Sequence, residues 1–151
     1  MSRMSPMSSG PVAIVDSLNS LLDAEANSLF RFMDEGSPYL GRTTAEMRKP
    51  LLEMVATGEK HMIELGEMVE SLNGVPHSRH VKPEEQYLAY LSIKFLLPKL
   101  LEDKKLMIER YSNVKTTMAG APPEVIDLLD RHVKVHQAHA KILEHAKKAK
   151  A

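Results

Sequence analysis

Six polar residues stand at positions where the surrounding helical pattern calls for apolar side chains. They are Glu25, His61, Lys104, His132, His136 and His139. A carboxylate or ammonium buried without a partner costs several kcal/mol, so these groups must pair with each other or with a metal ion. Imidazole nitrogens and a carboxylate oxygen suit a first-row transition metal such as Zn or Fe.

The predicted metal ligands come from three segments of the chain. His136 and His139 are three residues apart, so both project from one face of a helix. Together with His61 and Glu25 they offer three nitrogens and one oxygen. An ammonium is a poor ligand near pH 7. We therefore expect Lys104 to pair with Glu25 or to donate a hydrogen bond to a ligand.

A metal-free arrangement of the same residues is an equally good interpretation. Glu25 and Lys104 can form a buried ion pair whose remaining hydrogen bonds are satisfied by histidines, with His132 extending the group by one turn. The sequence leaves both interpretations open. The other histidines, His77, His80 and His145, are expected at the surface.

The elements that must position these residues are four helices. Apolar residues recur every three or four positions between clusters of glycine and proline, and no alternation typical of strands occurs. The predicted helices are Val12–Asp34, Thr43–Leu72, Pro83–Val114 and Pro122–Lys147. In the first of them the inward positions are Val15, Leu18, Leu22, Glu25, Leu29 and Phe32.

Two prolines fall inside these helices. Pro50 is expected to bend the second helix, and Pro98 should kink the third or divide it around Lys94–Leu97. A shift of one turn at Pro98 would bring Glu102 to the site in place of Lys104. The positions of Ile108 and Tyr111 favour Lys104.

The lengths of the helices and links predict an all-α, antiparallel four-helix bundle over residues 12–148, preceded by a flexible tail at 1–11. The link between the second and third helices, residues 74–83, is the natural crossover. Ten residues are short for that task, so residues 84–95 can form part of the crossing.

Four segments resemble the ferritin-like superfamily, in particular bacterioferritin and rubrerythrin chains. They are LNSLLDAE ending at Glu25, the stretch from His61 to Asn73-Gly74-Val75-Pro76, LLEDKKLMIERY ending at Tyr111, and HQAH at 136–139. The resemblance covers roughly residues 13–145. It implies the ferritin-like fold and assembly as a homodimer or a higher homo-oligomer.

The same resemblance implies that the site has changed. Ferritin-like di-iron proteins use one glutamate from each of two helices and two Glu-x-x-His motifs. Here Gly58, Lys104 and His136 stand where three of the four glutamates belong. We therefore expect a mononuclear, histidine-rich Fe or Zn site rather than a di-iron ferroxidase. No haem is expected, because Glu59 and Lys60 fill the gap in which bacterioferritins carry the haem-ligating methionine.

Composition narrows the possible partners. Lys and Arg total 20, as do Asp and Glu, so no basic excess points to nucleic acid or to an anionic membrane. No segment approaches a membrane span, and cysteine is absent, which fits a cytoplasmic protein. The expected role is metal binding or small redox chemistry on oxygen or peroxide. The alternative is a non-catalytic interaction or assembly module. A haem or small-molecule pocket at a dimer interface is the weakest possibility.

Overall fold

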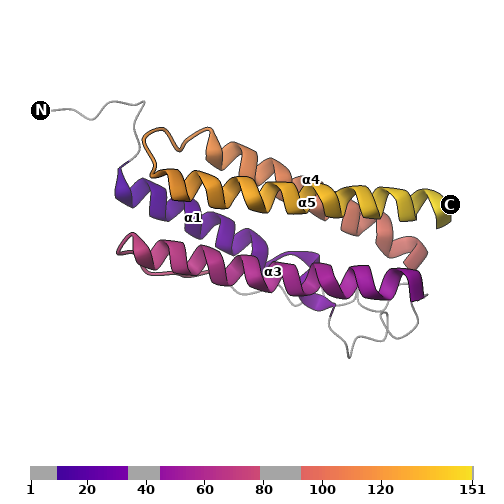
Figure 1. Ribbon diagram of the computed structural model, residues 1–151. Coiled ribbons are helices and arrows are strands. Elements are labelled where there is room, and N and C mark those ends of the chain that lie inside the picture. The colour runs from indigo at the N-terminus through magenta and orange to yellow at the C-terminus, as the bar shows by residue number, and fades with distance from the viewer. Residues whose placement is uncertain (1–9, 34–44, 79–92, 151) are drawn as a thin grey trace, which may run out of the picture.

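The computed structural model describes residues 10–33, 45–78 and 93–150 (Figure 1). Its four long helices are α1 (Pro11–Ala26), α3 (Ala45–Ser71), α4 (Ile93–Lys115) and α5 (Pro123–Lys150). A short 3-10 helix, η1 (Leu29–Phe32), follows α1. The predicted all-α four-helix bundle is confirmed. None of the helices in these ranges is long and apolar enough to cross a membrane.

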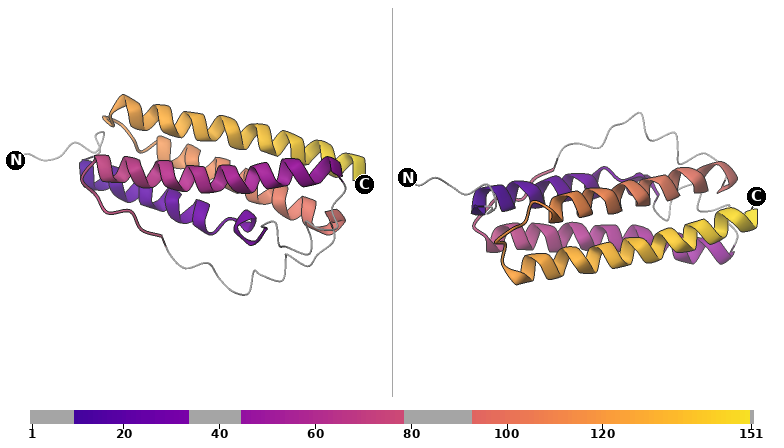
Figure 2. Two further views of the ribbon diagram at one scale, coloured as in Figure 1. Left: turned by 60° about the horizontal axis from the view of Figure 1, so that its bottom comes forward. Right: turned by 90° about the horizontal axis from the view of Figure 1, so that it is seen from above.

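The helix directions confirm the predicted crossover. α1 and α5 run one way along the bundle, and α3 and α4 run the other way (Figures 1 and 2). α1 packs mainly on α3, and α4 packs mainly on α5. α3 ends and α4 begins at opposite ends of the bundle, so these two consecutive helices are parallel, as a crossover between them requires. The helix starts predicted at Thr43 and at Pro83 lie outside the described residues.

The first helix is shorter than predicted. A continuous helix from Val12 to Asp34 is wrong, because α1 ends at Ala26 and the chain re-enters a 3-10 turn after Ser28. The Ser28 hydroxyl accepts a hydrogen bond from the Phe30 amide at 3.3 Å and donates one to Asp103 Oδ2 at 2.6 Å. The Leu29 amide donates to Asp103 Oδ1 at 3.3 Å. Asp103 on α4 therefore holds the break in place.

The break also changes which residues face inward. Leu29 was expected in the core but is only half-buried, whereas Phe30 and Met33 are buried. Asn27 and Ser28 are not helical, so the helical spacing of three and four residues does not predict which side chains after Ala26 point into the core.

Replacing Ser28 with alanine should lower the free energy of unfolding by about 1 kcal/mol, because the capping hydroxyl is lost. The Asp103 carboxylate would also lose a charge-assisted hydrogen bond. Urea unfolding measures the difference, with Ser20→Ala, an exposed position on α1, as the control. Equal unfolding midpoints for the two variants would contradict this role for Ser28.

Both helices with internal prolines are continuous. α3 runs through Pro50, and α4 runs unbroken from Ile93 through Pro98, so the predicted division around Lys94–Leu97 does not occur. The predicted register of α4 is confirmed, since Lys104 is 3% exposed while Glu102 lies on the surface.

The apolar core is divided into two clusters by a polar layer. One cluster fills the end formed by η1, the start of α3 and α4 and the end of α5; it includes Phe30, Met33, Leu51, Met54, Leu97, Leu100 and Leu143. The other fills the opposite end and includes Leu18, Leu21, Leu65, Val69, Tyr111, Leu128 and Leu129. Five buried polar residues lie between the clusters, with at least one from each long helix: Glu25, His61, Lys104, His132 and His136.

Candidate metal centre

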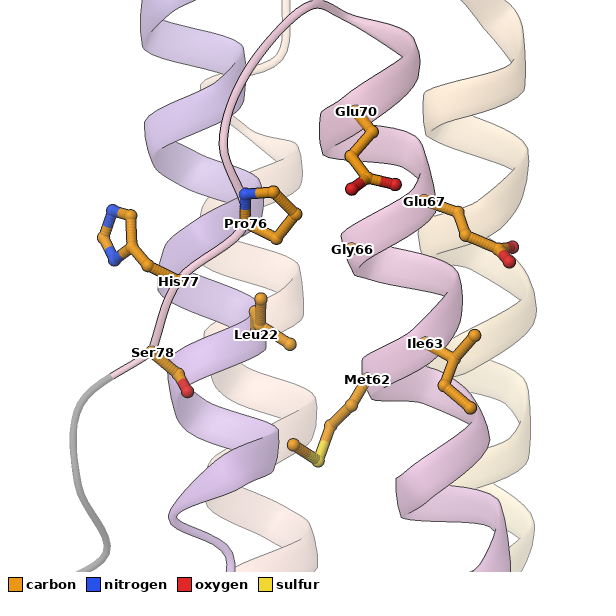
Figure 3. A pocket seen from close by; sticks show the side chains of 9 residues that line it. All are labelled: Leu22, Met62, Ile63, Gly66, Glu67, Glu70, Pro76, His77 and Ser78. Carbon is orange, nitrogen blue, oxygen red and sulfur yellow. The ribbon is translucent and has the colours of Figure 1, made fainter.

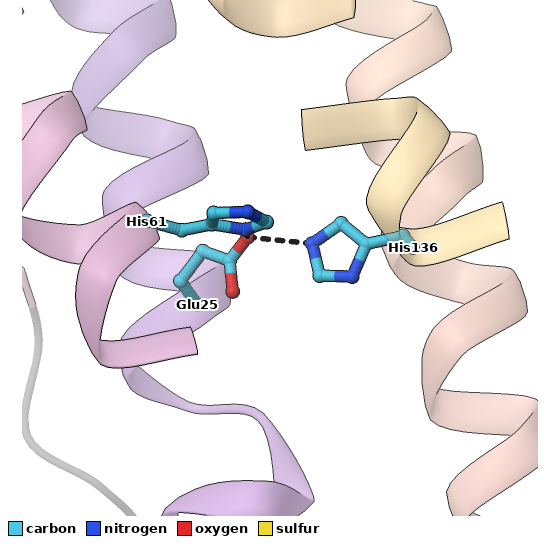
Figure 4. Close-up of side chains that lie close together, drawn as sticks. All are labelled: Glu25, His61 and His136. Atoms are coloured by element: carbon cyan, nitrogen blue, oxygen red, sulfur yellow. Dashed lines mark hydrogen bonds and ion pairs between the residues drawn. The ribbon is translucent and has the colours of Figure 1, made fainter. Parts of the chain in front are cut away.

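Glu25 is the hub of the polar layer. Its Oε2 atom accepts a hydrogen bond from the Tyr111 hydroxyl at 2.7 Å. The same oxygen lies 2.8 Å from His136 Nε2 and 3.1 Å from His61 Nδ1 (Figure 4). Burial alone would raise the pKa of Glu25, but hydrogen bonds from His136 and His61 outweigh it and hold the pKa far below its ordinary value. A buried carboxylate therefore receives hydrogen bonds from three other helices.

Three of the four predicted ligands converge. Glu25, His61 and His136 each place one potential ligand atom within 4.8 Å of the others, and all three side chains are buried. They come from α1, α3 and α5, so no single helix makes the site. Two nitrogens and one oxygen form a donor set that Zn and Fe accept.

His139 stands beside this group rather than in it. Its ring centroid lies 6.4 Å from that of His136. Its Nδ1 atom is buried and has no hydrogen-bond partner among the described residues. Burial, with Lys104 as the next cause, lowers the pKa of His139 to about 3, so the ring is neutral at pH 7. A role for His139 as a ligand stays a prediction.

Helix geometry explains why His132 lies closer to His61 than His139 does. At roughly 100° and 1.5 Å per residue, His132 and His139 both point about 40–60° to the same side of His136. His132 lies about 6 Å from His136 towards the start of α5, however, whereas His139 lies about 4.5 Å towards its end. The His132 ring stacks on His61 with centroids 3.6 Å apart. Its Nδ1 lies 2.8 Å from the Tyr111 hydroxyl and its Nε2 lies 2.8 Å from Glu64 Oε1. Burial is the main cause that lowers the pKa of His132 to about 4.

Lys104 contacts the site through an imidazole. Its Nζ lies 3.1 Å from His136 Nδ1 and 4.5 Å from the centre of the Phe30 ring. Burial lowers the pKa of Lys104 to about 8, although the charges of Glu25 and Asp103 act in the opposite direction. Of the two predicted roles of Lys104, hydrogen bonding to a ligand matches these contacts.

Arg31 is a second buried cation near the site, and the sequence did not point to it. η1 carries its side chain onto α3, where Nη2 donates to the carbonyl of Val55 at 2.7 Å. The guanidinium fills the space beside Gly58, in which any β-carbon would collide with Nη2. Its Nη1 lies 3.7 Å from Glu59 Oε2. Its Nε is buried without a hydrogen-bond partner in the described part of the chain.

A surface hollow between α1 and α3 is separate from the polar layer. It has a volume of about 390 Å³, and Figure 3 shows Met62, Ile63 and Glu67 on one side with Pro76 and His77 on the other. Its acidic residues, Glu67 and Glu70, form no group of metal ligands with other residues that the structure describes. The chemistry of the fold is therefore concentrated in the buried layer.

Comparison with known proteins identifies the fold. Neither a scan of protein families nor a search of curated proteins found a match. Among solved structures, the chain is similar to the bacterioferritin of Desulfovibrio desulfuricans, with a TM-score of 0.76, 15% sequence identity, and coverage of 91% of this chain and 80% of that one. That structure was determined to follow a diiron site in different catalytic states. The predicted ferritin-like four-helix fold is thus confirmed.

The residues present do not fit the di-iron arrangement of this fold. The di-iron arrangement of this fold needs four carboxylates, two of them in Glu-x-x-His motifs. In this chain a guanidinium lies beside Gly58, an ammonium reaches His136, and Glu25 is the carboxylate at the centre. Two adjacent cations would repel a second metal ion. Glu25, His61 and His136 form a group that could hold a metal ion.

Proposed function

We propose that this protein binds one transition-metal ion, Fe or Zn, through Glu25, His61 and His136. The observation that carries the proposal is the convergence of three ligand atoms from three helices within 4.8 Å in a fully buried layer. Ligands held by separate rigid helices keep their relative positions better than ligands on loops. His139 is the predicted fourth ligand, and its buried, unpartnered Nδ1 supports that assignment.

The neighbouring residues orient the proposed ligands. Tyr111 donates to Glu25, and Lys104 contacts the nitrogen of His136 that faces away from Glu25. The contact from Tyr111 fixes the direction of the carboxylate. With a metal ion on Nε2 of His136, the proton of that ring is on Nδ1, and Lys104 accepts it only as a neutral amine. Bound iron would supply redox chemistry on oxygen or peroxide, whereas zinc would supply a structural or Lewis-acid site.

Protein purified without a histidine tag should carry up to one metal ion per chain, and His136→Ala should carry none. Removing one of three converging ligands takes away a large share of the coordination. Elemental analysis after loading with Fe²⁺ or Zn²⁺ under dialysis measures the content. His145→Ala, a surface histidine on the same helix, is the matched control and should retain the metal. Absence of stoichiometric metal in the wild-type protein would rule out the proposal.

The second candidate is a non-catalytic interaction or assembly module whose buried layer needs no metal. It is favoured by the fact that the three ligand atoms already contact one another as hydrogen-bond partners. Such a layer satisfies its own buried groups. The same metal analysis separates the two candidates, because a self-sufficient network takes up no ion. Assembly as a homodimer and a cytoplasmic location stay predictions under either candidate.

A further inference from the structure

We propose that Arg31 limits this site to a single metal ion, because its guanidinium takes the place beside Gly58 that a second ion and its carboxylate ligand would need. The inference rests on the proposed function for the first ion. It assigns a specificity-determining role to a residue outside the ligand set.

The fit between Arg31 and Gly58 is close. The ideal β-carbon of residue 58 would meet Nη2 in a collision and lie 3.2 Å from Cζ. In this conformation of Arg31 the space is open because residue 58 carries no β-carbon. The guanidinium is then held by the Val55 carbonyl at 2.7 Å and by Glu59 at 3.7 Å, with the side chain only 11% exposed. A buried, anchored cation is therefore present where the chain could otherwise present a carboxylate.

Residue 58 stands where a metal-binding motif would carry its glutamate. Gly58 and His61 are three residues apart on α3, the spacing of a Glu-x-x-His metal motif. A side chain at position 58 would therefore point to the same side of the helix as His61. Arg31 reaches this position from another element, so a positive charge occupies the place of the glutamate of the motif.

The break in α1 brings both cations to one place. η1 follows the turn that Ser28 and Asp103 hold, and it carries Phe30 and Arg31 next to each other. Phe30 lies under the Lys104 ammonium, while Arg31 reaches α3. The predicted continuous helix would have sent these two side chains in other directions.

The buried charges are already balanced. Arg31 interacts with the charges of Glu25 and Asp103, and so does Lys104. Glu25 and Asp103 therefore face these two cations, and the exposed Glu59 also pairs with Arg31. A second divalent ion would add two positive charges to a group whose carboxylates already have cationic neighbours. Removing the guanidinium and adding one carboxylate at position 58 changes this balance by two charges, which matches the charge of one ion.

Three variants test the role of Arg31, with Zn²⁺ counted by native mass spectrometry and Co²⁺ followed by its absorption bands. Arg31→Leu with Gly58→Glu should bind one ion more per chain than Arg31→Leu with Gly58→Gln, the neutral control of the same shape. Gly58→Glu alone should show no gain, because the retained guanidinium would pair with the new carboxylate. Circular dichroism verifies that each variant keeps its helices.

The outcomes are distinct. The role of Arg31 is refuted if Gly58→Glu alone gains the extra ion, or if the folded Arg31→Leu, Gly58→Glu variant binds no more than its neutral control. If that variant does not fold, Arg31→Gln with Gly58→Glu replaces it, because glutamine keeps a polar group in the space. Its ion count is then compared with that of Arg31→Gln with Gly58→Gln. A wild-type protein that binds no ion refutes the proposed function. The role of Arg31 is still tested in that case by the difference in bound ions between the Gly58→Glu and Gly58→Gln variants.

Discussion

Replacing Glu25 with leucine should lower the free energy of unfolding by about 3–5 kcal/mol, the cost of leaving a buried charge without its partner. The carboxylate is 1% exposed and accepts from Tyr111, His61 and His136 at one oxygen. Leucine would strand these groups and remove the negative charge that favours the Lys104 ammonium. Urea unfolding of metal-free protein at pH 7 measures the loss.

A paired variant separates charge from packing. Glu25→Leu combined with Lys104→Met should recover part of the loss, because the second change removes the ammonium that Glu25→Leu leaves buried without a nearby negative charge. Glu67→Leu, at an exposed position on α3, is the control and should change little. If Glu25→Leu lowers the free energy of unfolding by less than about 1 kcal/mol, the other residues of the polar layer do not depend on the Glu25 carboxylate.

Acidification from pH 6.5 to 4.5 should destabilise the fold by up to about 1.4 kcal/mol per pH unit for each histidine that stays neutral. Burial is the leading cause that lowers the pKa of His132 to about 4 and that of His139 to about 3, from an ordinary 6.5. In this window the unfolded chain binds protons that the folded chain excludes. The stability is therefore complete above pH 6.5 and is lost as the pH falls.

Below about pH 4.5 the lowered pKa of Glu25 adds a second loss, because the unfolded carboxyl binds a proton before the folded one does. Thermal melts across this range measure both parts. His139→Gln should reduce the slope between pH 6.5 and 4.5 by the share of one proton, whereas His145→Gln, at the surface, should leave it unchanged. A stability that is constant from pH 6.5 to 4.5 would contradict neutral buried histidines.

The sequence predicted the fold and the centre of the site because their signals are local or periodic. A glutamate or lysine inside an apolar stripe is visible in the sequence alone, and Glu25, Lys104 and His136 were all found in this way. Their convergence followed from each standing near the middle of its helix. The order and spacing of four segments then predicted the ferritin-like fold, which the structural comparison confirms.

The parts that the sequence did not reveal depend on a break without a strong signal. Asn27 and Ser28 are ordinary poor helix formers, and neither glycine nor proline marks the end of α1. Without the break, Arg31 could not be placed beside Gly58, and Asp103 had no evident partner. The links from Glu64 to His132 and from Tyr111 to Glu25 are contacts between helices, which periodicity on one helix cannot show.

The polar layer between the two apolar clusters has a further consequence for how the helices align along the bundle axis. Leucine and methionine stripes are interchangeable enough that a helix could slide by one turn, about 5.4 Å, and still bury apolar area. Such a slide would set Lys104 or Glu25 against leucines and leave it unpaired. Only one axial alignment of the four helices joins Glu25, His61, Lys104 and His136 in one layer. The polar layer thus specifies the axial register of the helices, as a buried polar residue does in a coiled coil.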